Sequence, residues 1–335
     1  MDDQDTLRTY GNTNLPEGTE DRPLVTFALF AYNQEKYIRE AVEGAFSQTY
    51  SPLEIICSDD GSSDRTFDIM QEVVSAYTGP HSVLLRRNPH NLGLARHVNL
   101  VVDLARGEII TFAAGDDISL AGRVEAAVTA LRAHPEAGFY ESGNFRVDSA
   151  GAPLGAAKPV FEHDAAVSLA GFTSDAVRGF TGAARSYRIS VLKRFAPLDR
   201  FCPTEDSTFL LRCLMLGPGW YAVDQLVARR IHNANLSGDA ALVSMDYEAI
   251  WRQYRADAQA ALARGHIDKT THAAVTRWIE RTAIARSLTQ KSRGAPGAFW
   301  RQCVASLRRA ASPEVSRFEI FTLVAKAIFR KMLKL

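Results

Sequence analysis

The sequence predicts an α/β fold, in which a mostly parallel central sheet is sandwiched by helices and followed by a helical C-terminal extension. Short apolar runs of strand length, such as Leu24–Phe30 and Leu53–Ser58, alternate with segments of helical periodicity. This alternation is typical of a parallel sheet covered by helices on both faces. Residues 241–310 instead are alanine-rich, carry charges at regular intervals and contain few helix breakers, which favours helices.

The elements of the first half follow one another closely. The strand at Leu24–Phe30 leads into a helix over Gln34–Ser47, for which Asn33 is the expected N-cap. Apolar runs and helical spacing then predict strands at 53–58, 83–86 and 108–113, and helices ending at 77, over 94–104 and over 123–133. Each strand is thus followed by a helix, as a parallel sheet requires.

From about Phe139 the alternation weakens. Residues 149–176 are rich in Gly, Ala and Pro and predict loop or mixed structure. A helix over Thr204–Leu216 and a strand over Tyr221–Ile231 follow. We therefore expect a flexible, polar leader at 1–22 without the pattern of a signal peptide, a first domain at 23–240 with halves 23–120 and 121–240, and a helical region at 241–335.

Composition excludes several classes of protein. The 335 residues include 39 basic and 38 acidic ones, so the net charge of +1 gives no global attraction to nucleic acid. The four cysteines lie far apart in the sequence, which predicts reduced, buried thiols of a cytosolic protein. No window reaches the roughly 18–20 apolar residues needed to span a bilayer, and we expect a soluble or peripheral protein.

A first acidic cluster, Asp59–Asp64, ends a predicted strand and enters a turn. A carboxylate there can accept hydrogen bonds from a uracil-type imide N–H or from a ribose, and the following helix N-terminus favours negative charge nearby. Asp, Gly and Ser would also make an ordinary polar turn with an N-cap. Taken alone, the cluster leaves both interpretations open.

A second cluster, Gly115-Asp116-Asp117, also follows a predicted buried strand. Adjacent carboxylates in such a place repel each other and are costly to desolvate unless a cation or hydrogen-bond donors compensate. Mg²⁺ or Mn²⁺ bridging to a diphosphate would compensate, since Mg²⁺ is typically held by one or two carboxylates plus substrate phosphates. An exposed pair capping the next helix is the alternative.

Two further features lie later in the chain. Glu205 and Asp206 precede an apolar helix, where one carboxylate could be a general base or both could be first-turn acids that complement the helix dipole. His232 follows a predicted strand and two arginines, which suits a metal or phosphate environment, although a lone histidine is more often structural.

Together, the motifs resemble the family-2 inverting glycosyltransferases of the GT-A fold over roughly residues 23–240. The similar stretches are Leu24–Tyr37, Phe46–Tyr50, Glu54–Asp64, Asn91-Leu92-Gly93, Ala105–Glu108, Gly115-Asp116-Asp117, Thr204-Glu205-Asp206 and Arg230-Ile231-His232 with Asn235 and Ser237. One position departs from the family pattern, because the first acid of its DxD motif is replaced by Gly115. This departure leaves one carboxylate fewer for a metal.

The resemblance implies a role for each candidate residue. Asp60 would bind the nucleotide base and Asp116 the ribose, while Asp117 would bind Mn²⁺ or Mg²⁺. Asp206 would be the catalytic base, and His232 would sit near the metal or diphosphate. Four more residues are nucleotide-binding candidates on the same grounds: Phe30, Tyr32, Asn33 and Asn91.

The resemblance also implies an activity. A sugar would move with inversion from a nucleotide-diphosphate sugar, most simply a UDP-sugar, to the hydroxyl of a glycan or lipid-linked acceptor. Bacterial surface polysaccharide or glycan assembly in the cytoplasm, at the inner face of the plasma membrane, is the expected setting. Residues 23–120 would then be the nucleotide-binding half and residues 121–240 the acceptor half.

Two rival functions remain at this point. A nucleotidyltransferase would carry a Gly-rich, Lys- or Arg-bearing loop after its first strand, whereas residues 31–35 (AYNQE) contain no glycine. A non-catalytic module that binds sugar nucleotide would not need all three acidic clusters.

The last twenty residues form an amphipathic, basic segment. Such a helix suits the interface of an anionic membrane, and we expect peripheral contact through 316–335. Packing of the same helix on the catalytic domain or on a partner subunit is the alternative.

Overall fold

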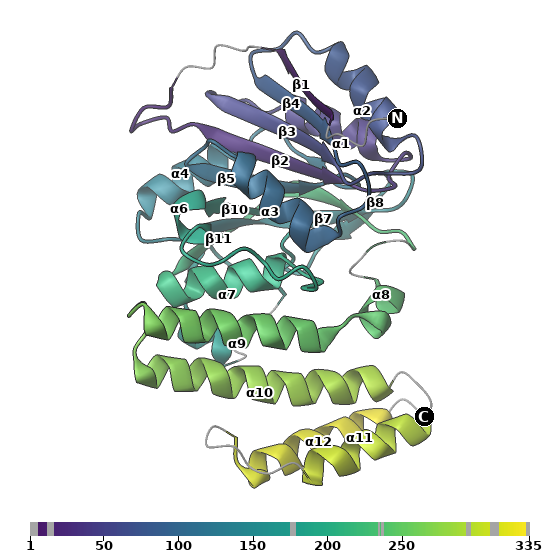
Figure 1. Cartoon of the computed structure of the whole chain (residues 1–335), viewed down its shortest axis with the longest axis vertical. Helices are drawn as coiled ribbons and strands as arrows, with labels where there is room; N and C mark the ends of the chain where they lie inside the picture. Colours follow the sequence, from purple (N-terminus) through teal and green to yellow (C-terminus); the bar gives the residue numbers. More distant parts are fainter. Residues whose placement is uncertain are drawn as a thin grey trace. The chain divides into compact units, whose positions relative to one another are not determined.

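The computed structural model describes residues 6–11, 17–174, 179–233, 235, 238–292, 296–308 and 315–332 (Figure 1). The chain divides into two compact units. The sheet unit comprises Met1–Phe172, Val177–Arg200 and Thr204–His232, and the helical unit comprises Thr173–Ala176, Phe201–Pro203 and Asn233–Leu335.

The sheet unit is built on one twisted sheet. Its described strands are β1 (Thr6–Gly11), β2 (Val25–Ala31), β3 (Leu53–Asp59), β4 (Ser82–Arg87), β5 (Ile109–Ala114), β6 (Ile118–Ser119), β7 (Phe139–Val147), β8 (Pro153–Ala156), β9 (Ala165–Val167), β10 (Arg185–Arg188) and β11 (Gly219–Arg230). The strands lie in the order β1-β4-β3-β2-β5-β10-β7-β11-β6, with β8 paired to β7 and β9 paired to β11. Its described helices are α1 (Ile38–Phe46), α2 (Thr66–Ser75), α3 (Leu94–Leu104), α4 (Arg123–Ala133), α5 (Leu169–Thr173), α6 (Ile189–Leu192) and α7 (Asp206–Leu216).

The predicted α/β fold with a central sheet and helices is confirmed. Neighbouring strands β4, β3, β2 and β5 are all parallel, and α1, α2 and α3 make the crossovers between them. Beyond β5 the sheet is mixed, because β10 runs antiparallel to both β5 and β7, while β11 is parallel to β7. Parallel pairing is therefore concentrated in the first half of the unit, where the sequence alternation is strongest.

Helices cover both faces of the parallel strands. On one face, Phe27, Leu29 and Cys57 pack in a single core with side chains of α1, α2 and α4. Side chains alternate along a strand, so Phe30 and Ser58 point to the opposite face. There His97 of α3 meets both, with its ring centroid 5.3 Å from that of Phe30 and its Nε2 atom 2.5 Å from Ser58 Oγ.

Six residues of the predicted flexible leader at 1–22 form a strand instead. Thr6–Gly11 form β1, which pairs antiparallel with the edge strand β4. The composition of this segment does not predict a strand. The strand is stabilised by backbone hydrogen bonds to the N–H and C=O groups that the edge strand β4 would otherwise leave unpaired. A polar strand needs little burial there, and Leu7 is 55% exposed.

The helical unit confirms the predicted helical C-terminal region. Its described helices are α8 (Asp239–Ser244), α9 (Tyr247–Ala263), α10 (Lys269–Ser292), α11 (Pro296–Arg308) and α12 (Arg317–Met332). A small core joins the last three helices through Leu288, Phe299 and Ile320, among others. In the part of the chain that the structure describes, no helix has the length and apolar character needed to cross a membrane.

Candidate functional site

The carboxyl ends of the parallel strands lie side by side, and the predicted site residues follow them. In the pairing register Asp59 lies between Ala31 and Arg87, and Phe30 lies opposite Ala114. The segments that continue from these ends carry Asn33, Asp60, Asn88 and Gly115-Asp116-Asp117. Ligands of open α/β sheets bind at this edge.

Asp60 is held by donors from two later segments. Its Oδ1 atom accepts a hydrogen bond from Asn88 Nδ2 at 2.6 Å and one from the Leu92 N–H at 2.9 Å. Its Oδ2 atom accepts from the Gly93 N–H at 3.1 Å. Burial raises the pKa of this carboxyl group, although these donors oppose the shift. The carboxylate is therefore fixed in direction before any ligand arrives.

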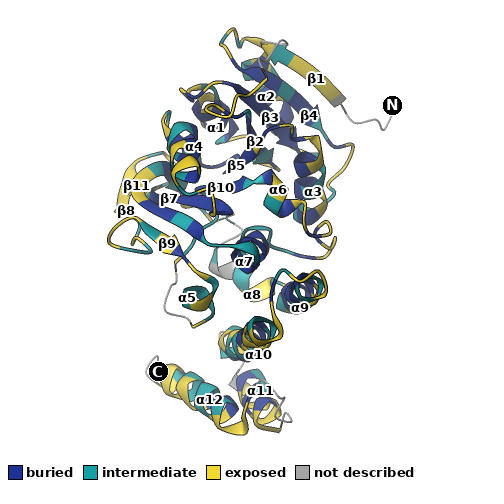
Figure 2. Ribbon diagram, turned by 90° about the vertical axis from the view of Figure 1, so that its left-hand side faces the viewer, coloured by how far each residue is buried: buried dark blue, intermediate teal, exposed yellow. Residues whose placement is uncertain are grey.

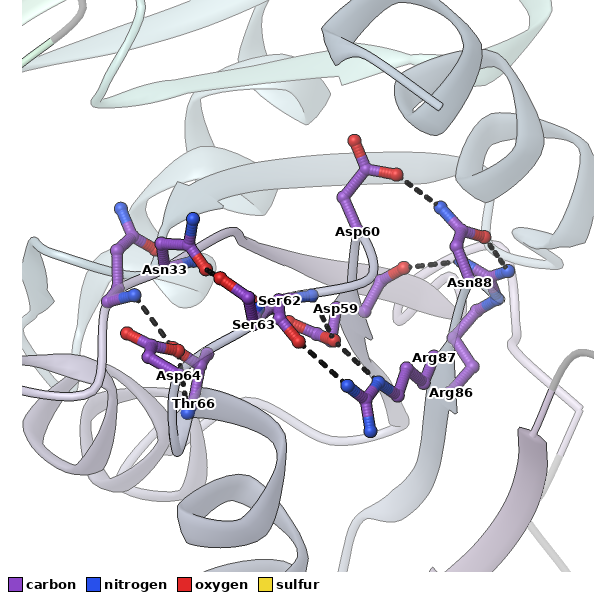
Figure 3. Close-up of polar contacts among 12 residues, drawn as sticks. Asn33, Asp59, Asp60, Ser62, Ser63, Asp64, Thr66, Arg86, Arg87 and Asn88 are labelled. Atoms are coloured by element: carbon purple, nitrogen blue, oxygen red, sulfur yellow. Dashed lines mark hydrogen bonds and ion pairs between the residues drawn. The ribbon is translucent and has the colours of Figure 1, made fainter. Parts of the chain in front are cut away.

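A buried arginine supports this arrangement from the strand below (Figure 3). Arg86 of β4 is fully buried, and its Nη2 atom donates to Asn88 Oδ1 while its Nη1 atom donates to Ser58 Oγ at 2.7 Å. Because Asn88 uses its oxygen for Arg86, its amide nitrogen must face Asp60. Ser58 also contacts His97, whose pKa is lowered to about 3, mainly by burial and further by the charge of Arg86.

The turn after β3 is tied to the turn after β2. Asn33 Oδ1 accepts from the Ser63 N–H at 2.9 Å, and the Asn33 N–H donates to Ser62 Oγ at 2.9 Å. Asn33 has a left-handed backbone, with φ of 52°, so it does not cap α1. The predicted N-cap is wrong: α1 starts later, after Tyr37, and has no side-chain cap. Figure 3 shows Asn33 reaching the Ser62–Ser63 turn instead.

The other nucleotide-binding candidates differ in their surroundings. Tyr32 is 45% exposed at the end of β2. Phe30 packs between His97 and Phe112, with ring centroids 5.3 and 5.1 Å away. Asn91 Oδ1 accepts from the Gly93 N–H at 2.7 Å, the same N–H that contacts Asp60. Asn91 therefore belongs to the Asp60 turn, while Tyr32 offers an open aromatic face.

The Asp116-Asp117 pair is joined to the end of β11. His232 Nε2 lies 2.9 Å from Asp116 Oδ2, and the Arg230 N–H donates to Asp117 Oδ1 at 2.8 Å. Arg230 also donates from Nε to the Asp116 carbonyl at 3.0 Å, and its guanidinium lies over Tyr37. Burial, and next the charge of Asp116, raise the pKa of Asp117 to about 7. The structure thus brings the adjacent Asp116 and Asp117 together with Arg230 and His232, which lie more than 100 positions later in the chain.

These residues fit a divalent cation that is completed by substrate oxygens. Among the described residues no group of three His, Cys, Asp or Glu side chains is arranged to hold a metal ion. Asp117 is a buried carboxylate whose charge is disfavoured without a cation. One or two carboxylates with phosphate oxygens are a common set for Mg²⁺.

Packing explains the glycine at the first position of the acidic motif. A Cβ atom on Gly115 would lie 2.9 Å from Ile38 Cδ1 and 3.1 Å from the Phe30 carbonyl oxygen, and closer still to Gln34 Oε1. No carboxylate fits there without displacing these groups. The end of β2, the turn after it and the start of α1 occupy the space that an acid would need.

Asp206 begins α7 and is positioned by a buried ion pair. Arg185 of β10 faces Glu141 of β7 in the strand register, and its Nε donates to Glu141 Oε2 at 2.8 Å. The same guanidinium donates from Nη1 to the Asp206 carbonyl at 2.8 Å. A Cβ atom on Gly182, which has φ of 67°, would overlap the Asp206 side chain, so glycine is needed on both counts.

The pKa of Glu205 is strongly perturbed by its surroundings. Burial, and next the charge of Asp206, raise the pKa of Glu205 to about 7. The two adjacent carboxyl groups therefore disfavour each other's ionisation. The helix start provides one carboxyl group whose pKa lies near neutral pH.

Arg123 joins the second and third acidic clusters. It is fully buried, and its Nη2 atom donates to the carbonyls of Phe112 at 2.6 Å and Ala183 at 2.9 Å. Its charge acts on Asp117, and Ala183 adjoins the glycine that packs on Asp206. Arg123 thus ties the end of β5, which leads to Asp117, to the segment that packs on Asp206.

Sequence reasoning missed the buried supports of the site. Arg86, Asn88, Arg123, Glu141 and Arg185 are each less than 2% exposed. A charged residue inside an apolar strand run, as Arg86 is in SVLLRR, was a readable signal of a buried polar contact. The partners of Glu141 and Arg185 depend on β10 pairing with β7, which no local pattern indicates.

A sheet that is parallel up to β5 and mixed beyond it, with carboxylates after its strand ends, is typical of the GT-A fold of glycosyltransferases. The model of the family described as glycosyl transferase family 2 matches residues 26–193, half of the chain. The chain belongs to this family, which confirms the resemblance of its motifs.

Curated relatives match over a shorter stretch. The putative glycosyltransferase EpsE of Bacillus subtilis is 33% identical over 112 residues, which cover 33% of this chain and 40% of EpsE. An uncharacterized glycosyltransferase of Haemophilus influenzae is 33% identical over 112 residues, covering 33% of this chain and 34% of that protein. The chain thus matches about a third of the length of these relatives.

Solved structures share the fold over most of the chain. S. aureus TarS 1–349 in complex with UDP-GlcNAc superposes with a TM-score of 0.60 at 15% identity, covering 92% of this chain and 89% of that one. The mannosyltransferase PcManGT from Pyrobaculum calidifontis, in complex with GDP-Man and Mn²⁺, gives a TM-score of 0.51 at 16% identity, covering 95% and 90%. At these identities the likeness concerns the fold.

Proposed function

We propose that the protein transfers a sugar, with inversion, from a nucleotide-diphosphate sugar to an acceptor hydroxyl. The observation that carries the proposal is the arrangement of Asp60, Asp116-Asp117 and Asp206 around one end of the sheet, on supports that are themselves buried. Donors of this kind are bound by TarS and PcManGT, which share the fold.

In this proposal residues 23–120 hold the donor. Asp60 accepts the imide N–H of a uracil base, because its two oxygens are aimed by Asn88, Leu92 and Gly93. Tyr32 offers an aromatic face for the base, and Asp116 accepts ribose hydroxyls. Phe30, Asn33 and Asn91 would add contacts from the neighbouring strand ends. We propose a UDP-sugar as the donor, because an imide N–H suits the carboxylate of Asp60.

Asp117 and His232 would hold Mn²⁺ or Mg²⁺ with the diphosphate oxygens. When bound, the cation would neutralise charge on the departing diphosphate. Neighbouring residues of the chain orient Asp117 and His232 for this role. The Arg230 N–H fixes one oxygen of Asp117, and Asp116 orients the His232 ring.

Asp206 acts as the base of the transfer. It takes the proton of the acceptor hydroxyl as the oxygen attacks the anomeric carbon from the face opposite the departing diphosphate. The raised pKa of Glu205, about 7, reduces the negative charge beside the attacking oxygen near neutral pH. The acceptor, a glycan or a lipid-linked sugar, would lie against residues 121–240.

The direct test is nucleoside diphosphate release by Asp206→Asn, with Glu205→Gln as the matched control. A general base contributes ~10²–10⁴-fold, so turnover should fall by that factor, about 3–5 kcal/mol of barrier. Glu205→Gln should retain most activity, because glutamine has the size of the neutral carboxyl group that a pKa of about 7 leaves partly populated near neutral pH. Near-normal turnover of Asp206→Asn with a normal melting temperature would remove Asp206 from this role.

The metal role has its own test. Asp117→Ala should abolish the difference in donor affinity between Mn²⁺ and EDTA, measured by calorimetry with the full chain. Tyr32→Ala, which changes the base contact, should weaken donor binding equally under both conditions. Equal donor affinity of the unchanged protein with Mn²⁺ and with EDTA would refute the metal role.

The rival functions predict different products. A nucleotidyltransferase would release pyrophosphate from a nucleoside triphosphate, and a binding module would release nothing.

We propose that the reaction belongs to bacterial surface polysaccharide or glycan assembly, in the cytoplasm at the inner face of the plasma membrane. A panel of donors, scored by nucleoside diphosphate release, separates these cases and identifies the sugar.

A further inference from the structure

Two helices of the helical unit present large apolar side chains to solvent. On α12, Phe318, Phe321, Phe329 and Met332 are 60–77% exposed, and on α11, Trp300, Val304 and Leu307 are 46–50% exposed. We call these seven side chains the apolar stripe. Figure 2 shows exposed positions on both helices, interspersed with buried ones. Soluble proteins rarely expose so many aromatic side chains on neighbouring turns without a partner for them.

Helix α12 has three faces rather than two. Ile320 and Val324 are buried in the core shared with α10 and α11. The exposed apolar residues recur at spacings of three, eight and three positions, which places them on a second side of the helix. Lys326 and Arg330, four positions apart and both exposed, lie on a third side. The core therefore does not explain the apolar stripe.

The charge of this region is distinct from that of the whole chain. Residues 296–335 contain eight of the 39 basic residues and two of the 38 acidic ones, a net charge of +6 in a chain whose total is +1. One of those two acids, Glu319, is paired with Arg277 at 2.6 Å. The rest of the chain is therefore net acidic, and its basic excess is concentrated beside the apolar stripe.

We propose that α11 and α12 form a docking surface for an anionic lipid bilayer. The apolar stripe would enter the boundary between head groups and acyl chains, while Lys326, Arg330 and their basic neighbours contact anionic head groups. A second copy of the chain fits less well, because two surfaces of charge +6 repel each other. The proposal extends the proposed function by giving a lipid-linked acceptor a surface on which to meet the enzyme.

Co-sedimentation of the full chain with vesicles tests the surface. We expect binding to phosphatidylcholine vesicles that contain phosphatidylglycerol, weaker binding as salt rises, and little binding to phosphatidylcholine alone. The double change Lys326→Glu and Arg330→Glu should weaken binding by at least about 25-fold, taking about 5-fold per lost basic residue. Phe321→Ser with Phe329→Ser should weaken it on every vesicle.

A matched control keeps the result specific. Leu154→Ser removes an apolar side chain that is 49% exposed in the sheet unit, and it should leave vesicle binding unchanged. All variants should keep the melting temperature and the nucleoside diphosphate release of the unchanged protein in vesicle-free solution. If the unchanged protein binds anionic vesicles but releases no nucleoside diphosphate from any donor, the proposed function is refuted and the docking surface is not.

Two results would overturn the docking surface. The first is an unchanged protein that stays in the supernatant with anionic vesicles at low salt. The second is a dimer on gel filtration that the Phe321→Ser and Phe329→Ser changes dissociate, since the apolar stripe would then be covered by a second copy.

Discussion

Restoring the missing acid of the metal motif should harm the protein rather than improve it. Gly115 lies against the connection from β2 to α1, where an added Cβ would approach Ile38 Cδ1 to 2.9 Å and the Phe30 carbonyl oxygen to 3.1 Å. Real Cβ atoms essentially never approach other atoms within 3.0 Å, so Gly115→Ala must displace its neighbours. Gly115→Asp must displace them further and add a third carboxyl group beside Asp116 and Asp117.

The magnitude follows from the atoms in contact. Overpacking of a filled site costs about 1–3 kcal/mol. Two of the three nearest atoms are ends of flexible side chains, while the third belongs to the backbone. We therefore expect Gly115→Ala to lower the free energy of unfolding by about 1–2 kcal/mol, in the lower part of that range.

Urea denaturation of four proteins measures this effect: unchanged, Gly115→Ala, Gln34→Ala and the double variant. Gln34 Oε1, the nearest atom, is buried and has no hydrogen-bond partner among the described residues. Gln34→Ala alone should therefore cost little, and the double variant should recover most of the stability that Gly115→Ala loses. Independent, additive effects of the two changes would contradict the packing argument.

Metal titration completes the test. Gly115→Asp should bind Mn²⁺ no more tightly than the unchanged protein, because the new carboxylate has no room to reach a cation held by Asp117. Tighter Mn²⁺ binding by Gly115→Asp, without loss of stability, would refute the reasoning.

Two other supports of the site give predictions of their own. Asn88→Ala removes one of the donors to Asp60, and a hydrogen bond to a charged group is worth about 1.5–3 kcal/mol, so KM for the donor should rise about 10-fold or more with kcat nearly unchanged. An equal fall of kcat at saturating donor would contradict a role confined to the nucleotide base. His97 has a pKa of about 3 in the folded protein, below its ordinary value of 6.5. Between these two pH values its ring therefore binds a proton in the unfolded chain but not in the folded one. Stability should therefore fall by up to about 1.4 kcal/mol per unit as pH drops below 6.5, and His97→Gln should flatten this limb in urea titrations at several pH values. An unchanged slope in His97→Gln would show that other groups cause it.

Local patterns predicted the parallel half of the sheet well. The segments at 94–104 and 123–133 coincide with α3 and α4, because helical spacing of buried residues is a local property of the chain. Strand β1 and the Asn33 turn were missed for the opposite reason. Each depends on a partner elsewhere, namely β4 for the strand and the Ser62–Ser63 turn for Asn33.

The candidate site likewise contains residues that local sequence patterns predict and residues that depend on distant partners. Asp60 and Asp116-Asp117 follow strands, so the ends of apolar runs locate them in the sequence. The partners that hold the site residues cannot be located in this way. Arg230 bonds Asp117 across 113 positions, and the Arg185–Glu141 pair beside Asp206 spans 44. Their partners become visible only when β10 and β11 have joined the sheet.

That long separation has a consequence for a chain growing from the ribosome. Every donor to Asp60 lies before residue 94, so the turn around Asp60 can form once the first few strands have been made. The bond from Arg230 to Asp117 must wait until β11 is complete. An unfinished chain can thus order its nucleotide-base turn but not its acidic pair, so nascent fragments would lack a finished reaction centre until the last strand of the sheet is in place.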